Sequence, residues 1–267
     1  QNSRDHRKIC VIDGKVAFTG GVNLADEYAN EITRFGHWKD TAIMLKGDAV
    51  QSFTMLFLEM WAVNQMEPAD CQNYLTPKDV VPDPPRGYVI PYGDHPYDNE
   101  NVGEEVYFHI LNHSKKYVHI MTPYLILDSE MITTLTRAAK SGIEVIIIMP
   151  HIPDKWYAFV LAHTYYKELI QAGVSIYEYT PGFVHAKVFV ADDDTATVGT
   201  INLDYRSLYL HFECGAYIYD HPVVVDIERD FQETLKKCQK ISLTEVENRP
   251  VTHKVMGQIL RLIAPLM

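Results

Sequence analysis

The sequence predicts an α/β protein of two pseudo-symmetric repeats, each with a mixed, largely parallel β-sheet flanked by helices, with one active site shared at their interface. The first observation is a motif, His-x-Lys-x4-Asp, that occurs twice, at His6, Lys8 and Asp13 and again at His185, Lys187 and Asp192. A chance occurrence of this spacing is expected only about 0.05 times in such a chain. The second observation is that strand-like and helix-like segments alternate through the second half, as in α/β folds.

The similarity between the two halves extends beyond this motif. Three further identical pairs recur at the same offset of 179 positions: Gly20 and Gly199, Asn23 and Asn202, and Leu24 and Leu203. Duplication of one ancestral unit explains the shared register better than coincidence does.

Composition and charge limit the possible functions. Of the 267 residues, 47% are hydrophobic, which is ample for real cores. The formal net charge of −11 disfavours nucleic acid as a partner, because proteins that bind it usually present a basic face. The four cysteines show no Cys-x-x-Cys spacing, so neither a zinc site nor a disulfide framework is predicted.

The start of the chain suggests a fragment. The sequence begins with Gln1, and only five residues precede His6, whereas His185 follows a full series of predicted elements. We therefore expect the upstream part of the first repeat to be missing, together with any targeting signal located there. The longest apolar run near a strand, residues 145–149, is far shorter than the roughly 20 residues of a membrane span.

The first repeat is predicted to contain a hairpin, a further strand and a helix. Strands are predicted at residues 8–12, 16–19 and 41–45, and a helix at residues 49–63. Asp13 and Gly14 have the turn chemistry of a β-hairpin. The helix carries apolar residues at helical spacing: Phe53, Leu56, Phe57 and Met60.

A change of composition separates the halves. Five prolines lie among polar residues there: Pro68, Pro77, Pro82, Pro84 and Pro85. This composition predicts a linker over residues 66–86. The chain then divides into the C-terminal part of the first repeat, residues 1–65, the linker, and the second repeat with a C-terminal helix, residues 87–267.

The second repeat is predicted to alternate. Helices are predicted at residues 102–114, 129–141, 155–172 and 222–238, and strands at residues 118–121, 144–149, 175–179, 187–191, 195–198 and 213–219. Gly142 and Gly173 follow two of the helices, as C-terminal caps do. Apolar residues at helical spacing between positions 255 and 266 predict a last helix docked on the protein's own core, with a bilayer surface as the alternative.

The duplicated motif has the chemistry of a phosphate site. Residues two positions apart on a strand face the same way, so each His and Lys of the motif lie together. Lysine attracts phosphoryl oxygens, and histidine can act as nucleophile, acid or base near neutral pH. Asn23 and Asn202 can add amide donors. Face to face, the two copies surround one anion with two His, two Lys and two Asn.

This set of side chains supports double displacement at phosphorus. One neutral histidine attacks, and the other, protonated, supplies a proton to the leaving oxygen and later takes one from the incoming alcohol or water. The lysines and asparagines stabilise the charge on phosphorus, so neither a metal nor another cofactor is required. Asp13 and Asp192 fall on the odd spacing from lysine and are assigned a supporting, hydrogen-bonding role.

The same residues carry a resemblance to a known family. The two motifs, followed by Gly20-Gly21-x-Asn23 and Gly199-Thr200-x-Asn202, resemble the phospholipase D superfamily. Longer stretches resemble bacterial cardiolipin synthases, notably Trp38-Lys39-Asp40-Thr41, Thr122-Pro123-Tyr124 and Asn202-Leu203-Asp204-Tyr205-Arg206-Ser207 through Phe212-Glu213. The resemblance covers nearly the whole chain.

The resemblance implies a phospholipase-D-like fold and a specific reaction. A phosphatidyl group passes from one phosphatidylglycerol to another through a phosphohistidine, with release of glycerol. It implies His6 as nucleophile, His185 as acid and base, and Asp40 and Glu213 as carboxylates that orient the imidazoles. It also implies phosphatidylglycerol and the membrane surface as partners, and a bacterial cell membrane location with the catalytic part on the cytosolic side, held by membrane helices absent here. The hydroxyl that often follows the motif glycine is present in Thr200 and replaced by Gly21 in the first copy.

Other interpretations stay open at this stage. The same chemistry serves a phospholipase D that uses water, or a nuclease, which the charge disfavours; an inactive truncated module is a third. Ordinary roles are also possible: turns for Asn23 and Asn202, salt bridges for Asp40 and Glu213, and loop packing instead of substrate contact for Thr122 and Tyr124. The histidines outside the motif, such as His109, His119, His211 and His253, are expected to be ordinary core or surface residues.

Overall fold

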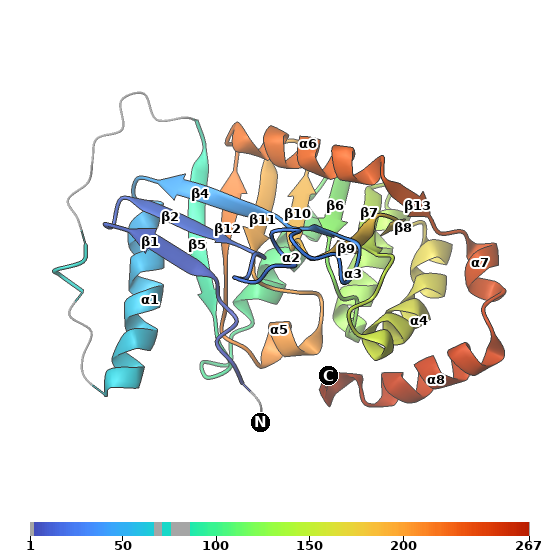
Figure 1. Ribbon diagram of the computed structural model, residues 1–267. Coiled ribbons are helices and arrows are strands. Elements are labelled where there is room, and N and C mark those ends of the chain that lie inside the picture. The colour runs from blue at the N-terminus through green and yellow to red at the C-terminus, as the bar shows by residue number, and fades with distance from the viewer. Residues whose placement is uncertain (1–2, 67–70, 76–85, 267) are drawn as a thin grey trace.

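The computed structural model describes residues 3–66, 71–75 and 86–266. Its largest unit is an eight-stranded sheet with the order β13-β8-β7-β6-β10-β11-β12-β5 (Figure 1). The strands of this sheet are β5 (Tyr88–Asp94), β6 (Tyr117–Met121), β7 (Glu144–Pro150), β8 (Ser175–Tyr179), β10 (Val188–Ala191), β11 (Thr195–Gly199), β12 (Glu213–Tyr219) and β13 (Cys238–Lys240).

The large sheet is mixed. Among its described strands, parallel pairing joins β6 to β7 and β7 to β8, where a helix separates consecutive strands as the alternation predicted. The remaining neighbours are antiparallel, because the hairpin of β10 and β11 occupies the middle of the sheet and β12 returns beside it. The predicted α/β class with a mixed sheet is confirmed, with a smaller parallel part than the sequence pattern indicated.

Helices cover one face of this sheet, and their apolar stripes explain why. The helices are α2 (Val102–His113), α3 (Ser129–Lys140) and α4 (Trp156–Ala172). In α3, Met131, Leu135 and Ala138 are buried at helical spacing in one cluster with Val145 and Ile147 of β7. The side chains that alternate with these on β7 point to the other face, where α6 (Val223–Leu235) packs.

The first half forms a smaller sheet on that second face. Its antiparallel strands, in the order β1-β2-β4, are β1 (Ile9–Ile12), β2 (Val16–Gly20) and β4 (Ala42–Lys46), followed by α1 (Ala49–Gln65). Ala17 and Leu45 belong to the same apolar cluster as Val188 and Val198 of the large sheet. The two halves therefore share a core. These strands and the helix agree with the sequence predictions to within a few residues.

The division into domains stays a prediction. Most of the predicted linker 66–86, namely residues 67–70 and 76–85, lies outside the described residues. The sequence pattern did not predict β5, which follows this region and pairs with β12. It also did not predict several short elements: β3 (His37–Lys39), β9 (Gly182–Val184), α5 (Tyr205–Tyr209), β13 and α7 (Leu243–Glu247).

The chain ends in α8 (Val251–Leu262) and a short 3-10 turn, η1 (Ala264–Leu266). Helix α8 packs closely against α4, because Gly257 has no side chain where a Cβ atom would lie 2.5 Å from Cγ2 of Thr164. The predicted C-terminal helix is thus present and docked on the protein. No helix in the described ranges combines the length and apolar character needed to cross a bilayer.

Candidate active site

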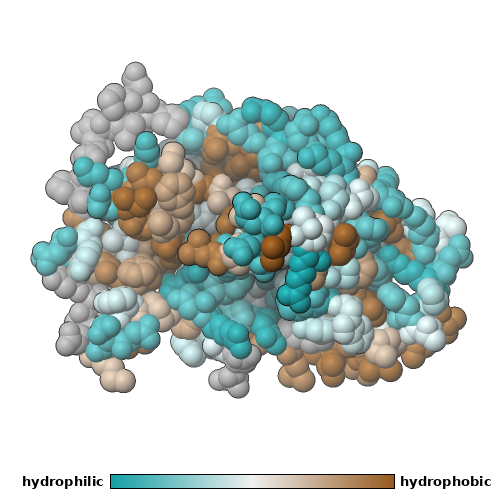
Figure 2. Space-filling model, viewed as in Figure 1, coloured by the Kyte–Doolittle hydropathy of each residue, from teal (hydrophilic) through white to brown (hydrophobic). Residues whose placement is uncertain are grey.

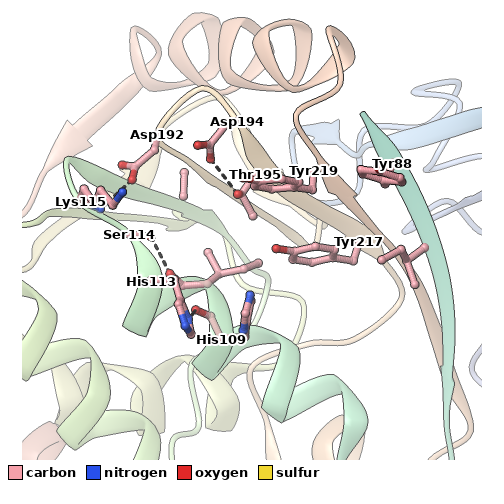
Figure 3. A pocket seen from close by; sticks show the side chains of 13 residues that line it. Tyr88, His109, His113, Ser114, Lys115, Asp192, Asp194, Thr195, Tyr217 and Tyr219 are labelled. Atoms are coloured by element: carbon pink, nitrogen blue, oxygen red, sulfur yellow. Dashed lines mark hydrogen bonds between the residues drawn. The ribbon is translucent and has the colours of Figure 1, made fainter. Parts of the chain in front are cut away.

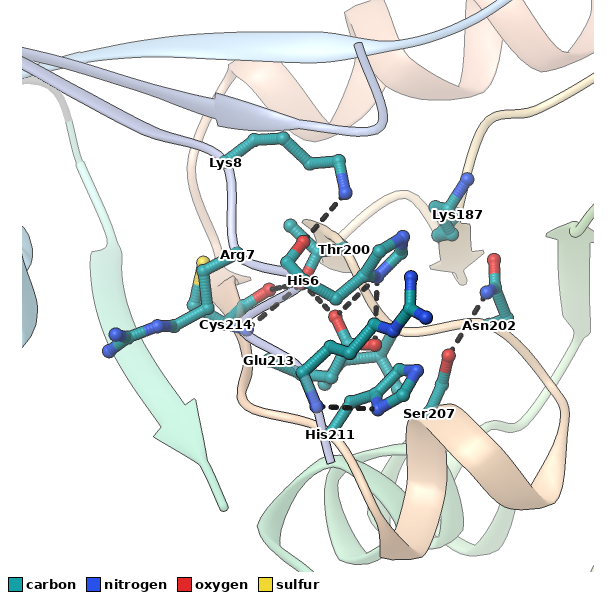
Figure 4. A network of polar contacts seen from close by, with 12 residues as sticks. His6, Arg7, Lys8, Lys187, Thr200, Asn202, Ser207, His211, Glu213 and Cys214 are labelled. Atoms are coloured by element: carbon teal, nitrogen blue, oxygen red, sulfur yellow. Dashed lines mark hydrogen bonds and ion pairs between the residues drawn. The ribbon is translucent and has the colours of Figure 1, made fainter. Parts of the chain in front are cut away.

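Pairing between the chain start and the second half positions His6. Arg4 and His6 exchange backbone hydrogen bonds with Phe212, at 2.9 Å each. This pairing places the His6 imidazole beside the next residue, Glu213, whose carboxylate oxygens lie 2.9 and 3.0 Å from Nδ1 (Figure 4). Glu213 is fully buried, whereas the side chain of His6 is 27% exposed. A carboxylate that accepts from Nδ1 leaves the Nε2 lone pair free to react.

His185 is positioned in the same way by the first half. Strands β3 and β9 pair in parallel, and the backbone N–H of His185 donates to the carbonyl oxygen of Lys39 at 2.7 Å. The imidazole Nδ1 then lies 2.8 Å from Oδ2 of Asp40. Each histidine is thus hydrogen-bonded to a carboxylate from the other half. The resemblance implied that Asp40 and Glu213 orient the imidazoles, and the structure brings each to the histidine of the opposite repeat.

Both motif lysines lie close to these histidines, Lys187 buried and Lys8 half-buried. Nζ of Lys8 donates to the carbonyl oxygen of His6 at 2.6 Å, and Nζ of Lys187 donates to that of His185. Burial lowers the pKa of Lys8, and it lowers that of Lys187 to about 7, helped by the positive charge of Lys8 and opposed by Asp40. Two interacting ammonium groups with lowered pKa values favour a bound anion, which would raise both pKa values again.

Burial also governs the electrostatics of the second pair. Burial, followed by the charge of Lys187, lowers the pKa of His185 to about 4, although the hydrogen bond to Asp40 opposes the change. Nζ of Lys187 lies 2.9 Å from the same Nδ1 atom, a repulsive contact once that nitrogen carries its proton toward Asp40. Burial disfavours the ionised form of Asp40, but His185 and Lys187 hold its pKa below the usual value.

Both histidines line one cavity of about 740 Å³. Asn23 and Asn202 line it as well, as does Tyr124. The two asparagines are held alike, since Nδ2 of Asn23 donates to the Tyr28 hydroxyl at 2.6 Å and Nδ2 of Asn202 donates to Oγ of Ser207 at 3.0 Å. Tyr28 and Ser207 are separated by the same 179 positions as the motifs. The duplicated register therefore ends in one common cavity.

Thr200 and Gly21 lie behind the two carboxylates. The hydroxyl of Thr200 donates to Oε2 of Glu213 and accepts from the backbone N–H of Cys214 at 3.0 Å. A Cβ atom on Gly21 would lie 2.1 Å from Oδ1 of Asp40. The missing hydroxyl of the first copy thus has a steric reason, because Asp40 occupies the space that a side chain at position 21 needs.

The aspartates of the motif lie at the far ends of the hairpins, away from this cavity. Asp13 is exposed in the turn between β1 and β2 with a φ of 52°. The carboxylate of Asp192 accepts from the backbone N–H groups of Lys115, Lys116 and Tyr117 at 2.6–3.0 Å. Asp192 lines a separate hollow of about 460 Å³ (Figure 3). The hydrogen bonds of Asp192 agree with the supporting role expected from the sequence, and for Asp13 that role stays a prediction.

Thr122 and Tyr124 have different surroundings. Thr122 is buried, and its hydroxyl donates to the carbonyl oxygen of Tyr124 at 2.9 Å and accepts from the backbone N–H of Leu203. This is loop packing. Tyr124 lines the cavity, and its hydroxyl donates to Oδ2 of Asp154 at 2.6 Å and accepts from Lys155.

Several cavity residues were not singled out from the sequence. His211, which we expected to be an ordinary residue, lies with its ring centroid 6.0 Å from that of His6 and accepts from the backbone N–H of Arg4 through Nδ1. Trp38 and Tyr28 pack against the His185 ring at centroid distances of 5.2 Å each. Tyr28 could have been predicted as a cavity residue, because the repeat offset of 179 matches it to Ser207. No sequence pattern predicts that His211 lies at the cavity.

A mixed sheet flanked by helices, with the histidines of both motifs lining one cavity, defines a phospholipase D-like protein. Residues 107–235 match the family described as "Cardiolipin synthase, PLD-like domain", and the chain belongs to the phospholipase D superfamily. A cardiolipin synthase of Geobacillus kaustophilus is 36% identical over 100% of this chain and 53% of the relative. An uncharacterized protein of Streptococcus mutans is 56% identical over 100% of this chain and 57% of the relative.

The chain spans about half the length of the curated relatives it matches. Among solved structures, a phosphatidylserine synthase of Haemophilus influenzae superposes with a TM-score of 0.74 at 15% identity, covering 98% of this chain and 71% of that one. At this identity, the likeness supports the fold alone.

Proposed function

We propose that this chain carries the active site of a cardiolipin synthase, which transfers a phosphatidyl group from one phosphatidylglycerol to another and releases glycerol. The observation that carries the proposal is the pair of imidazoles, each hydrogen-bonded through Nδ1 to a buried carboxylate, that line one cavity. The sequence similarity to cardiolipin synthases favours phosphatidylglycerol as the donor. The reaction takes place at a membrane surface, where both lipids reside.

The reaction has two steps. In the first, Nε2 of His6 attacks the phosphorus, the bond from phosphorus to the glycerol oxygen breaks, and His185 gives its proton to that oxygen. In the second, His185 takes a proton from the hydroxyl of another phosphatidylglycerol. The resulting alkoxide attacks phosphorus and releases His6. His6 is assigned as nucleophile because its side chain is the more exposed of the two, 27% against 8%, and because the resemblance to cardiolipin synthases implies this role for it.

The electrostatics of the cavity fit this sequence of steps. The low pKa of His185 follows from burial and from the charge of Lys187 in the protein without substrate. A bound phosphodiester brings a negative charge to both groups, so His185 takes up a proton as the substrate binds. Lys8, Lys187 and the amides of Asn23 and Asn202 then stabilise the charge that gathers on the phosphoryl oxygens.

Product analysis with defined lipids tests the proposal. The chain is supplied with phosphatidylglycerol, and the products are resolved by mass spectrometry. Cardiolipin and glycerol in equal amounts are expected. Phosphatidic acid as the main lipid product would show instead that water is the acceptor and would overturn the assignment as a synthase.

A further inference from the structure

The outward face of the C-terminal helix is unusual. A surface helix normally turns its apolar stripe toward the core. In α8 and η1 the large apolar side chains point to solvent instead: Val251, Val255, Met256, Ile259, Leu262, Ile263 and Leu266. Leu262 is 84% exposed and Leu266 is 77% exposed. We call these seven residues the α8 face. Figure 2 shows brown, hydrophobic side chains along the lower edge of the molecule, where α8 lies in Figure 1.

The packing of α8 fixes this orientation. Its inward side has two small residues, Gly257 and Ala264, and one large apolar residue, Leu260, all of them buried. Gly257 faces α4 at a position where a Cβ atom would lie 2.5 Å from Cγ2 of Thr164, so this side of α8 packs closely against α4. The larger side chains are left outside as a result. Exposed apolar patches of this kind commonly mark interaction surfaces.

The α8 face is continuous with the active-site cavity. Leu260, Ile263 and Leu266 line the same cavity as His6 and His185. Trp156, at the start of α4, also lines the cavity and is 60% exposed. An exposed indole beside an apolar face is typical of side chains that sit at the boundary between lipid headgroups and acyl chains.

The charge of this segment distinguishes between possible partners. The protein carries a net charge of −11, but residues 250–266 contain Lys254 and Arg261 and no Asp or Glu. Nζ of Lys254 donates to the carbonyl oxygen of Glu247, and the Arg261 guanidinium lies over the Tyr165 ring, 3.8 Å from Oε2 of Glu168. Long basic side chains at the edge of an apolar stripe can exchange such contacts for anionic headgroups as the stripe enters the bilayer. We propose that the α8 face, with Trp156, docks the protein onto a bilayer of anionic phospholipid and thereby brings the cavity opening to the lipid surface. This inference deepens the proposed function, since it names the surface from which that site takes its lipids.

Vesicle binding by a matched pair of variants tests the inference. The triple variant Val255→Ser, Ile259→Ser, Leu262→Ser removes exposed side chains that do not line the cavity. The control, Ile12→Ser, Met44→Ser, Val225→Ser, removes three exposed apolar side chains from β1, β4 and α6. Each chain is sedimented with vesicles of phosphatidylglycerol or of phosphatidylcholine.

The parent chain and the control are expected to sediment with phosphatidylglycerol vesicles, and less with phosphatidylcholine. The α8 triple variant should bind at least tenfold more weakly while keeping the parent's melting temperature. In a second measurement, brominated lipids should quench the fluorescence of the parent and not that of Trp156→Phe. Unchanged vesicle binding by the α8 variant overturns the inference. So does a parent dimer that the same substitutions dissociate without any effect of lipid, because a second copy would then be the occupant.

Activity on short-chain phosphatidylglycerol, dispersed as monomers, separates this inference from the proposed function. The α8 variant should make cardiolipin from monomers at the parent's rate and lose activity only on vesicles. If no chain makes cardiolipin from either form but the α8 variant alone loses vesicle binding, the docking surface holds and the proposed function fails. If all chains are active on monomers and bind vesicles equally, the proposed function holds and the docking surface fails.

Discussion

At the scale of single residues, the central feature is that both histidines use Nδ1 to contact a carboxylate, so both present Nε2 to the cavity. The near-symmetry makes their roles hard to separate by inspection. A trapped intermediate separates them, because only the nucleophile becomes covalently attached to the lipid.

Replacement of His6 by Ala is expected to abolish any covalent phosphatidyl adduct. Acid quenching during turnover, followed by peptide mass spectrometry, detects the adduct on the parent chain. His185→Ala is the matched control: it should still form the adduct slowly and fail to release it. An adduct that persists in His6→Ala would exclude His6 as the nucleophile.

Gly21→Ala should impair catalysis through Asp40. The added Cβ atom would lie 2.1 Å from Oδ1 of Asp40, so the carboxylate must move away from His185. Misplacement of a catalytic group by about 1 Å can cost about 10²-fold in rate, and we expect a fall in kcat of this order. Asp40→Asn should give a similar loss, and the two changes together should not add. Full activity of Gly21→Ala would argue against an orienting role for Asp40.

A buried histidine outside the candidate site, His163, is expected to contribute to the pH dependence of stability. Burial lowers the pKa of His163 from 6.5 to about 4, although the Glu178 carboxylate, 3.3 Å from Nε2, opposes the change. The unfolded chain therefore takes up a proton between pH 6.5 and 4 that the folded chain does not. Stability from this group is full above pH 6.5 and falls by up to about 3 kcal/mol as the pH approaches 4.

His163→Gln should remove that part of the pH dependence. Urea unfolding at pH 7 and pH 5 measures the difference between parent and variant. The exposed His113 provides the control, as His113→Gln should leave the parent's dependence unchanged. An equal change in the free energy of unfolding between pH 7 and pH 5 for all three chains would contradict the prediction.

At the scale of elements, the close contact between α4 and α8 depends on one missing side chain. Gly257→Ala should lower the free energy of unfolding by about 1 kcal/mol, because the clash with Thr164 outweighs the better helix propensity of alanine. In a Thr164→Ala background the clashing methyl group is absent, so the same change should be neutral or stabilising. Thermal unfolding of the four chains tests this, and an equal effect in both backgrounds would rule out the contact as the cause.

The sequence predicted elements well where they are long and periodic, and poorly where tertiary pairing creates them. Helices such as α3 and the strands of both hairpins carry strong periodicity, and they were located to within a few residues. Strands β3 and β9 have three residues each and exist because they pair with each other across 145 positions of the chain. Local patterns contain no record of such pairing, although it is what brings Asp40 to His185.

At the scale of the whole molecule, the sequence predicted most residues of the candidate site but only part of how they are arranged. The offset of 179 positions identified His6, Lys8, Asn23 and their counterparts as one set. It did not indicate that the carboxylate partners are exchanged between halves. His211 reaches the cavity through backbone pairing of Arg4 with Phe212, which is a long-range contact without a sequence signal.

The proposed reaction uses only side chains of the protein, so removal of metal ions tests whether the whole molecule needs a metal for activity. Dialysis against EDTA should leave transfer between phosphatidylglycerol molecules unchanged, because the lysines and asparagines supply the charge stabilisation. Measurement of cardiolipin formation before and after dialysis checks this. A strong loss that added Mg²⁺ or Ca²⁺ restores would contradict the assignment.

The exchange of carboxylates between the halves also bears on how the duplicated gene can change. The imidazole of each repeat is aligned by a carboxylate of the other repeat. Neither repeat can therefore lose its site residues while the other keeps the activity. Loss of the site residues of one repeat removes its own histidine and also the carboxylate that orients the histidine of the other repeat. Paralogous halves of this kind are therefore expected to evolve under mutual constraint.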